Sequence, residues 1–145
     1  MEIGDGVTSL GARAFYSCFS LSSIVIPDGV TSIDTQALFM WCYSLPSVTI
    51  PNGVTSMGNQ AFYGCTLSSV VIPDGVTSIN SKTFYNCTGV RYYDFTRHTT
   101  VPTLSNTDAF NGIAADCEIR VPAALADEWK AATNWATYAD YIVGV

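Results

Sequence analysis

Charged side chains are scarce in this 145-residue chain, and basic ones are the scarcest. Only 12% of the residues are charged, and six Lys and Arg stand against twelve Asp and Glu, which gives a formal net charge of −6. Nucleic-acid binding needs a basic face opposite the phosphates, and binding to a membrane surface needs a cluster of Lys and Arg. We therefore expect no nucleic-acid partner and no membrane-surface partner.

Long hydrophobic runs are missing as well. No apolar run reaches the roughly 18 residues from which a spanning helix is recognised, so we expect no membrane span. No secretory signal peptide is recognisable at the N-terminus. Because Met1-Glu2-Ile3 begins inside a repeat, we expect the chain to be a fragment of a longer protein.

The residues of common metal and catalytic sites are also few. Histidine occurs once, at His98, and no Cys-x-x-Cys pair is present, so we expect no metal site and no cofactor. The carboxylates are dispersed, and no pair stands out for acid–base chemistry. A nucleophilic pair of Cys87 with His98 is conceivable, but we expect His98 to be a solvated loop residue. The chain is therefore expected not to be an enzyme.

What the chain does contain is a repeated ten-residue pattern. It occurs at Ile24–Ile33, Val48–Met57 and Val70–Ile79, and a fragment opens the chain at Ile3–Leu10. Apolar residues alternate, a Pro-Asp-Gly or Pro-Asn-Gly corner follows, and Val-Thr-Ser-apolar ends the pattern. Alternation with period two predicts a β-strand. Proline fixes φ and glycine can adopt a positive φ, so the corner is predicted to be a turn.

The repeat has a period in the twenties. Val-Thr-Ser or its equivalent starts at Val7, Val30, Val54, Val76 and Val101, which gives spacings of 23, 24, 22 and 25 residues. This period is typical of a leucine-rich-repeat solenoid. We therefore predict an α/β repeat of about five coils of 22–25 residues over residues 1–122. Such coils bury their apolar faces only by stacking on their neighbours.

The second half of each copy carries a Phe and then a Cys three residues later. The Phe positions are Phe15, Phe39, Phe62, Phe84 and Phe110, and the Cys positions are Cys18, Cys42, Cys65, Cys87 and then Ile113. This spacing predicts one or two helical turns with an inward face. Stacked coils would place like residues about 5 Å apart, so we expect a ladder of buried Phe and reduced thiols. Disulfides between neighbouring thiols remain possible at that spacing.

We predict a right-handed, curved solenoid with one parallel sheet and a C-terminal cap. The predicted strands are Ile24–Ile26, Val48–Ile50, Val70–Ile72, Tyr93–Phe95 and Ile119–Val121. Residues 123–145 are predicted to form a helical cap over the open end, with an amphipathic helix near Ala123–Thr133. The first coil has no such cover, so we expect self-association through the N-terminal edge.

The motif Val-Thr-Ser-Ile-x-x-x-Ala-Phe-x-x-Cys-x-x-Leu-x-x-Val-x-Ile-Pro resembles the BspA-like, or treponemal-type, class of leucine-rich repeat. Its copies are Val7–Pro27, Val30–Pro51, Val54–Pro73 and Val76–Thr96, and the resemblance covers roughly residues 3–122. It implies a secreted or surface-displayed bacterial protein that adheres to host matrix proteins or other cells, with no common catalytic residues. The segment from Val121 to Ile142 is similar to the tail that ends many bacterial members.

The outward residues of the predicted strands differ between repeats. The first three repeats offer small residues such as Ser23, Ser47 and Ser69, whereas the last two offer aromatic and charged ones. Exposed aromatic residues and Arg are typical binding anchors. We therefore predict a ligand-binding face for a protein or glycan, made by Tyr92, Asp94, Arg97, His98, Glu118 and Arg120. The alternative is a structural spacer within a larger surface protein.

Cys117 lies outside the Cys ladder and next to Glu118. We expect this thiol to be partly exposed and therefore the most reactive of the five.

Overall fold

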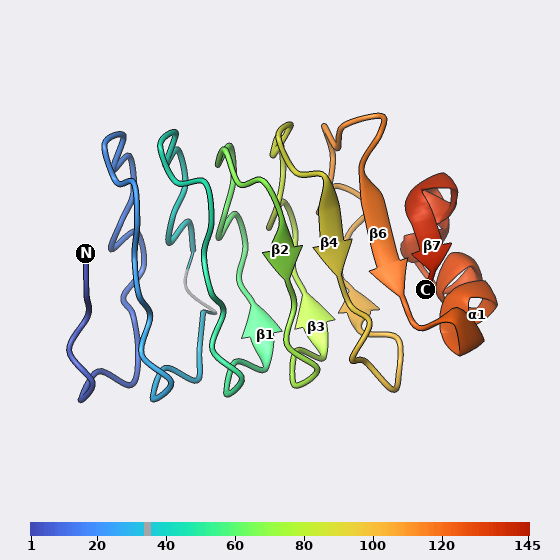
Figure 1. Cartoon of the computed structure of the whole chain (residues 1–145), viewed down its shortest axis with the longest axis horizontal. Coiled ribbons are helices and arrows are strands. Elements are labelled where there is room, and N and C mark those ends of the chain that lie inside the picture. Colours follow the sequence, from blue (N-terminus) through green and yellow to red (C-terminus); the bar gives the residue numbers. More distant parts are fainter. Residues whose placement is uncertain (34–35) are drawn as a thin grey trace.

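The repeats stack side by side along the long axis of the molecule, with the N-terminus at one end and the helical segment at the other (Figure 1). The computed structural model describes residues 1–33 and 36–145. In chain order the elements are β1 (Ser56–Met57), β2 (Val70–Val71), β3 (Ser78–Ile79), β4 (Tyr92–Asp94), β5 (Thr103–Leu104), β6 (Glu118–Val121), η1 (Ala123–Leu125), α1 (Ala126–Ala131), η2 (Trp135–Tyr141) and β7 (Ile142–Gly144).

The predicted parallel sheet is present with the strand order β2-β4-β6-β7. Its pairs are all parallel, and the strands predicted at Val70–Ile72, Tyr93–Phe95 and Ile119–Val121 are confirmed to within one or two residues at either end. Side chains alternate between the two faces, so that Tyr93 and Ile119 are buried while their neighbours along the strands are partly exposed. This alternation is what aims the residues of the candidate site outward.

The first two predicted strands are wrong or barely formed. The segment Ile24–Ile26 contributes one isolated bridge, to Glu2, and Val48–Ile50 is not a strand. Pro46 and Pro51 bracket this second segment. Pro51 has a counterpart in Pro73, but Pro46 stands where the next repeat has Ser68, whose N–H donates to the Pro46 carbonyl. Proline has no N–H to give to a ladder, so this segment has one donor fewer.

A second parallel sheet, with the order β1-β3-β5, lies outside the predicted strands. Its strands are the Val-Thr-Ser-apolar segments that follow each corner. Isolated bridges between Ser9 and Ser32 and between Ile33 and Met57 extend the same ladder toward the N-terminus. Each repeat therefore hydrogen-bonds to its neighbours on two sides of the coil.

The corners are β-turns, as predicted, but their glycines do not adopt the positive φ that the prediction assigned to them. The Val76 N–H donates to the Pro73 carbonyl at 3.0 Å, and the other corners are closed in the same way. None of the three corner glycines has a positive φ. A Cβ on Gly75 would lie 3.2 Å from the Asn52 carbonyl oxygen of the preceding repeat. Close approach between coils therefore favours glycine at this corner.

The predicted helical turns are also wrong, because the Ala-Phe segments are chains of non-helical turns. In the second repeat Ala37 and Trp41 have positive φ values of 59° and 66°, which interrupt a helix. The N–H groups of Ala37, Phe39 and Trp41 donate to the next repeat at 2.7–2.9 Å, while those of Met40 and Cys42 close turns within their own repeat. Donors that a helix would use internally therefore join neighbouring coils.

The stacked ladder of Phe rings is present along the core. Neighbouring rings of Phe15, Phe39, Phe62, Phe84 and Phe110 lie 5.2–5.4 Å apart between centroids, with planes 6–15° from parallel.

The thiol ladder runs beside the rings, and all five cysteines are free. The thiols of Cys42, Cys65 and Cys87 each donate to the carbonyl of the preceding repeat's Phe at 3.0–3.2 Å. Cysteine in this position is therefore a hydrogen-bond donor as well as an apolar core residue.

Residues 123–145 cover the last repeat. The predicted helix at Ala123–Thr133 is a shorter α-helix, α1, between the two 3₁₀ segments η1 and η2. Trp129 and Trp135 are buried, and the Trp135 Nε1–H donates to the Pro102 carbonyl at 2.7 Å. The strand β7, which the sequence pattern did not predict, pairs with β6 and adds a fourth strand to the sheet.

Candidate functional site

Four of the six predicted site residues lie together on the outer face of β4 and β6. The register pairs Tyr92 with Glu118 and Asp94 with Arg120. All four side chains are partly exposed, because each alternates with a buried strand residue. The two strands therefore present one aromatic ring, two carboxylates and one guanidinium on a single face.

Arg120 contacts two of the other groups, Glu118 and Tyr92. Its Nε–H donates to Glu118 Oε2 at 2.7 Å, and the two side chains are 37% and 43% exposed. The guanidinium carbon lies 4.0 Å from the centroid of the Tyr92 ring. The hydrogen bond with Glu118 raises the pKa of Arg120 above its already high value. The Arg120 guanidinium therefore stays charged and is oriented by two neighbours.

Asp94 is tied to its own chain. Its Oδ1 accepts a hydrogen bond from the Thr96 N–H at 2.9 Å, an arrangement that commonly starts a turn. This bond shapes the corner that carries Arg97 and His98. Asp94 therefore contributes to the face and also to the position of that corner.

Arg97 is exposed and stands apart from the other four. It lines a hollow of about 270 Å³ together with apolar and small polar residues of earlier repeats. Those residues are Val48, Thr49, Ile50, Asn52, Val71 and Pro73. Across residues 1–33 and 36–145 the one ion pair is that of Glu118 with Arg120, so the Arg97 guanidinium makes no salt bridge there. The hollow lies beside the unpaired segment Val48–Ile50.

His98 is a core residue, which corrects the prediction of a solvated loop histidine. It is only 4% exposed, and its Nε2–H donates to the Val76 carbonyl at 3.2 Å. The ring packs edge-on against Phe95 and Trp129, with centroids 5.2 and 6.0 Å away. Burial lowers the pKa of His98 from its ordinary value. His98 therefore does not belong to the binding face and joins the corner to the cap.

Cys117 corrects a second prediction, because its thiol is buried at 4% exposure. Burial raises its pKa to about 12, which leaves little of the reactive thiolate at neutral pH. The most exposed cysteine is Cys18 in the first repeat. The position of a cysteine inside or outside the Cys ladder does not predict its exposure, because exposure depends on which neighbouring segments cover the repeat.

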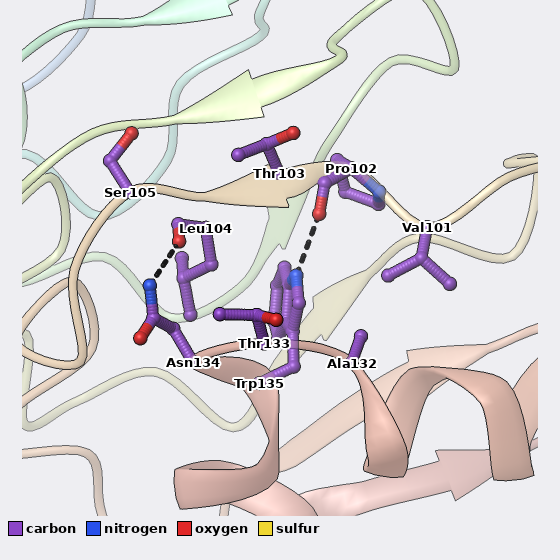
Figure 2. A pocket seen from close by; sticks show the side chains of 9 residues that line it. All are labelled: Val101, Pro102, Thr103, Leu104, Ser105, Ala132, Thr133, Asn134 and Trp135. Carbon is purple, nitrogen blue, oxygen red and sulfur yellow. Dashed lines mark hydrogen bonds between the residues drawn. The ribbon is translucent and has the colours of Figure 1, made fainter.

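Figure 2 shows a second hollow, of about 460 Å³, between the Val101–Ser105 segment and the link from α1 to η2. The Asn134 side chain donates to the Leu104 carbonyl at 2.6 Å, and Trp135 donates to the Pro102 carbonyl from the same side. These contacts attach the cap to the last repeat. We therefore interpret this hollow as part of the structural contact between the cap and the last repeat.

Stacked parallel-strand coils of this length define a leucine-rich-repeat solenoid. The chain belongs to the BspA-type leucine-rich repeat family, whose model matches residues 1–123 in six copies. No curated protein matches the chain. The number of full coils stays a prediction, because six family copies need not equal the number of complete coils.

Solved structures share the fold. A leucine-rich repeat protein from Bacteroides ovatus ATCC 8483 is 30% identical, with a TM-score of 0.70 over 83% of this chain and 30% of that one. A leucine-rich cell surface protein from Faecalibacterium prausnitzii A2-165 is 26% identical, with a TM-score of 0.64 over 82% of this chain and 40% of its own. The leucine-rich repeat protein of T. pallidum is 22% identical, with a TM-score of 0.71 over 85% of this chain and 58% of its own. The chain thus spans less than two thirds of each.

Within the described residues, no helix is long and apolar enough to cross a membrane.

Proposed function

We propose that the chain is a non-catalytic protein-interaction or adhesion module of a secreted or surface-displayed bacterial protein. In this proposal the solenoid of residues 1–122 supplies the binding face and residues 123–145 close its end. The observation that carries it is the group formed by Tyr92, Glu118 and Arg120 on the outer face of β4 and β6. The family and the name of the F. prausnitzii cell surface protein support the extracellular location.

On the sheet face Glu118 and Asp94 offset the charge of Arg120. It is therefore Arg97 beside the apolar hollow that favours a ligand with both apolar and anionic groups. Arg120 is held in place before any ligand arrives, so it loses little side-chain freedom on binding. Arg97 adds a second guanidinium beside an apolar hollow. Host or bacterial proteins supply this combination in aliphatic and acidic side chains, and acidic glycans supply part of it.

Binding to immobilised host matrix proteins and glycans tests the proposal. We expect Arg120→Ala to weaken binding to the best ligand by about tenfold, which corresponds to about 1.4 kcal/mol. Lys130→Ala is the matched control, because it removes one exposed cation from the cap and should leave affinity unchanged. Equal losses in both variants would contradict a specific role for the sheet face. Absence of binding across the whole panel would favour the spacer function.

We also propose that the chain self-associates at the first repeat. The contact surface is the apolar ladder, and not the strand edge that the sequence-based reasoning suggested. The backbone of this edge has a partner, since the Val25 N–H donates to the Met1 carbonyl at 3.0 Å. The open part is the core ladder, where Phe15, Cys18 and Leu21 are only partly buried. A hollow of about 490 Å³ lies there, lined by Met1 and residues 17–21. Light scattering at rising concentration should show a growing mass that Phe19→Ser reduces; a constant monomer mass would contradict this.

A further inference from the structure

A continuous row of aromatic side chains runs over the turn segments of the first four repeats. The ring contacts connect Phe19 to Tyr43, Tyr43 to Trp41, Trp41 to Tyr63 and Tyr63 to Tyr85, at centroid distances of 4.8–5.7 Å. These five residues are called the aromatic belt below. They come from turns rather than strands, so the aromatic belt is a different surface from the candidate site on β4 and β6.

The aromatic belt is exposed and held in a fixed arrangement. Phe19 is 55% exposed and Tyr43 is 49% exposed, and the other three rings are partly exposed. Gly64 makes room for one of them, since a Cβ at this position would lie 2.9 Å from Cε3 of Trp41. Burying exposed rings that are already positioned would cost little conformational entropy.

The charges around the aromatic belt are opposite to those of the rest of the chain. The four turn segments 11–21, 36–46, 58–68 and 80–90 contain no Asp or Glu, although the chain has twelve. The two cations of these segments are Arg13, which lies 5.8 Å from the Tyr16 ring centroid, and Lys82, which lies 5.7 Å from that of Tyr85. Asp108 of the fifth repeat accepts hydrogen bonds from the Ser81 hydroxyl and the Lys82 N–H, so this surface carries two cations against one carboxylate in a chain with a net charge of −6.

The turn backbone does not require these rings. The fifth repeat makes the same inter-repeat bond, with the Asn86 N–H donating to the Asn111 carbonyl at 2.7 Å. In that repeat Asn111 takes the position of Tyr85, and Ala114 takes the position of Tyr43. Since the fold forms there without rings, their presence in four consecutive repeats points to contact with a partner.

We propose that the aromatic belt binds a protein partner through a segment of acidic and aliphatic side chains. Arg13 and Lys82 would pair with the carboxylates, and the rings would bury the aliphatic groups. Aromatic residues and Arg are the usual anchors of protein interfaces.

The ring geometry favours a protein over a glycan. The Phe19–Tyr43 and Tyr63–Tyr85 pairs are within 9° and 12° of parallel, so these rings cover one another's faces and leave edges toward solvent. Ring edges carry the positive end of the quadrupole and attract carboxylate and carbonyl oxygens. Sugars stack on open ring faces, and pairing covers one face of each of these four rings.

A random peptide library displayed on phage and selected on the whole chain provides the probe. We expect the enriched peptides to be rich in Asp or Glu together with Leu, Ile or Val. The double variant Arg13→Ser with Lys82→Ser, and separately Tyr43→Ser, should each weaken binding of the enriched peptides by about tenfold. Arg91→Ser with Lys130→Ser is the matched control, because it removes two exposed cations outside the aromatic belt and should change nothing.

Trp41 provides a local readout of binding. Trp129 and Trp135 are buried at 0% and 1% exposure, so acrylamide reaches mainly Trp41, and a peptide on the aromatic belt should protect this indole from quenching. The same protection in the double variant would contradict the proposed pairing of the peptide with Arg13 and Lys82, whereas its loss together with unchanged Trp129 and Trp135 emission supports the proposal.

Four outcomes would overturn the proposal. One is the absence of any enriched peptide, and another is enrichment of peptides without acidic residues. A third is binding that the aromatic-belt variants leave intact, and the last is protection of Trp41 by heparin or hyaluronan alone, which would make the ligand a glycan. The sheet-face variant Arg120→Ala should retain aromatic-belt binding, so the proposals for the two surfaces are tested independently.

Discussion

The two ends of the solenoid carry similar residues in different surroundings. Phe15 at the first repeat is only partly buried, whereas Phe110 at the last is fully buried, with the Trp135 and Tyr138 rings 5.6 and 5.4 Å away. Both rings occupy the same position in the repeat and stack on one Phe neighbour. The difference teaches that a solenoid residue needs cover on both sides, from a repeat or from a cap, to be fully buried.

Hydrogen bonding differs much less between the two ends. At the first repeat the N-terminal ammonium group donates to the Ser23 carbonyl at 3.0 Å, and Met1 accepts from Val25. At the last repeat β7 pairs with β6. The outer segment therefore has backbone partners at both ends, and the two ends differ most in the apolar cover of the Phe ladder.

The largest expected effect compares the middle of the Phe ladder with its open end. Phe62→Ala should destabilise the fold by about 3–5 kcal/mol, because the flanking Phe39 and Phe84 cannot fill the cavity. Phe15→Ala should cost clearly less, since part of that ring is already in water. Denaturant unfolding measures both; equal losses would show that the first repeat is as well covered as the interior.

A smaller loss of stability should follow from removing the hydrogen bonds that attach the cap to the last repeat. The Tyr138 hydroxyl donates to the Thr107 carbonyl and accepts from the Phe110 N–H at 3.1 Å. Tyr138→Phe removes both bonds and leaves a buried N–H without a partner, at a cost of about 1–3 kcal/mol. Thermal unfolding checks this, with the exposed Tyr43→Phe as control. A loss of stability smaller than that of Tyr43→Phe would mean that ring packing alone holds the cap.

The parts of the fold that depend on one repeat's own pattern were predictable. The period placed the strands at Val70–Ile72 and Ile119–Val121, and the recurring Phe predicted the ladder. Features that depend on the neighbouring repeat were missed. The corner glycines are set by the approach of the preceding coil, and the Ala37–Cys42 turns give donors to the next coil rather than to a helix.

The site was predictable to the same degree. Alternation along β4 and β6 correctly grouped Tyr92, Asp94, Glu118 and Arg120. His98 was placed wrongly because its longer corner folds inward beneath Trp129, and nothing within that corner's sequence indicates the packing of the cap. The aromatic belt was missed because its residues lie in turn segments that were read as helical.

Lower pH should weaken the capped end selectively. Burial lowers the pKa of His98 in the folded chain, against opposing effects of its backbone hydrogen bonds and of Asp74 and Asp94. The unfolded chain therefore binds this proton more readily, so stability should be intact above the unfolded value of about 6.5 and fall as pH drops below it. Denaturant melts between pH 7.5 and 5, in steps of about half a unit, measure the slope. His98→Gln should flatten it, and an unchanged slope in that variant would assign the effect to carboxylates.

The smallest effect concerns reactivity rather than stability. We expect Cys18 to react first with a thiol reagent under native conditions, because it is the one cysteine that is not buried. Cys65, Cys87 and Cys117 should react slowest, because thiolate is the reactive form. The hydrogen bond with Cys42 and burial raise the pKa of Cys65, and burial raises the pKa of Cys87 and Cys117 to about 12. Timed labelling followed by mass mapping gives the order. Labelling of Cys117 before Cys18 would mean that the capped end opens more often than the uncapped one, which would reverse the comparison between the two ends.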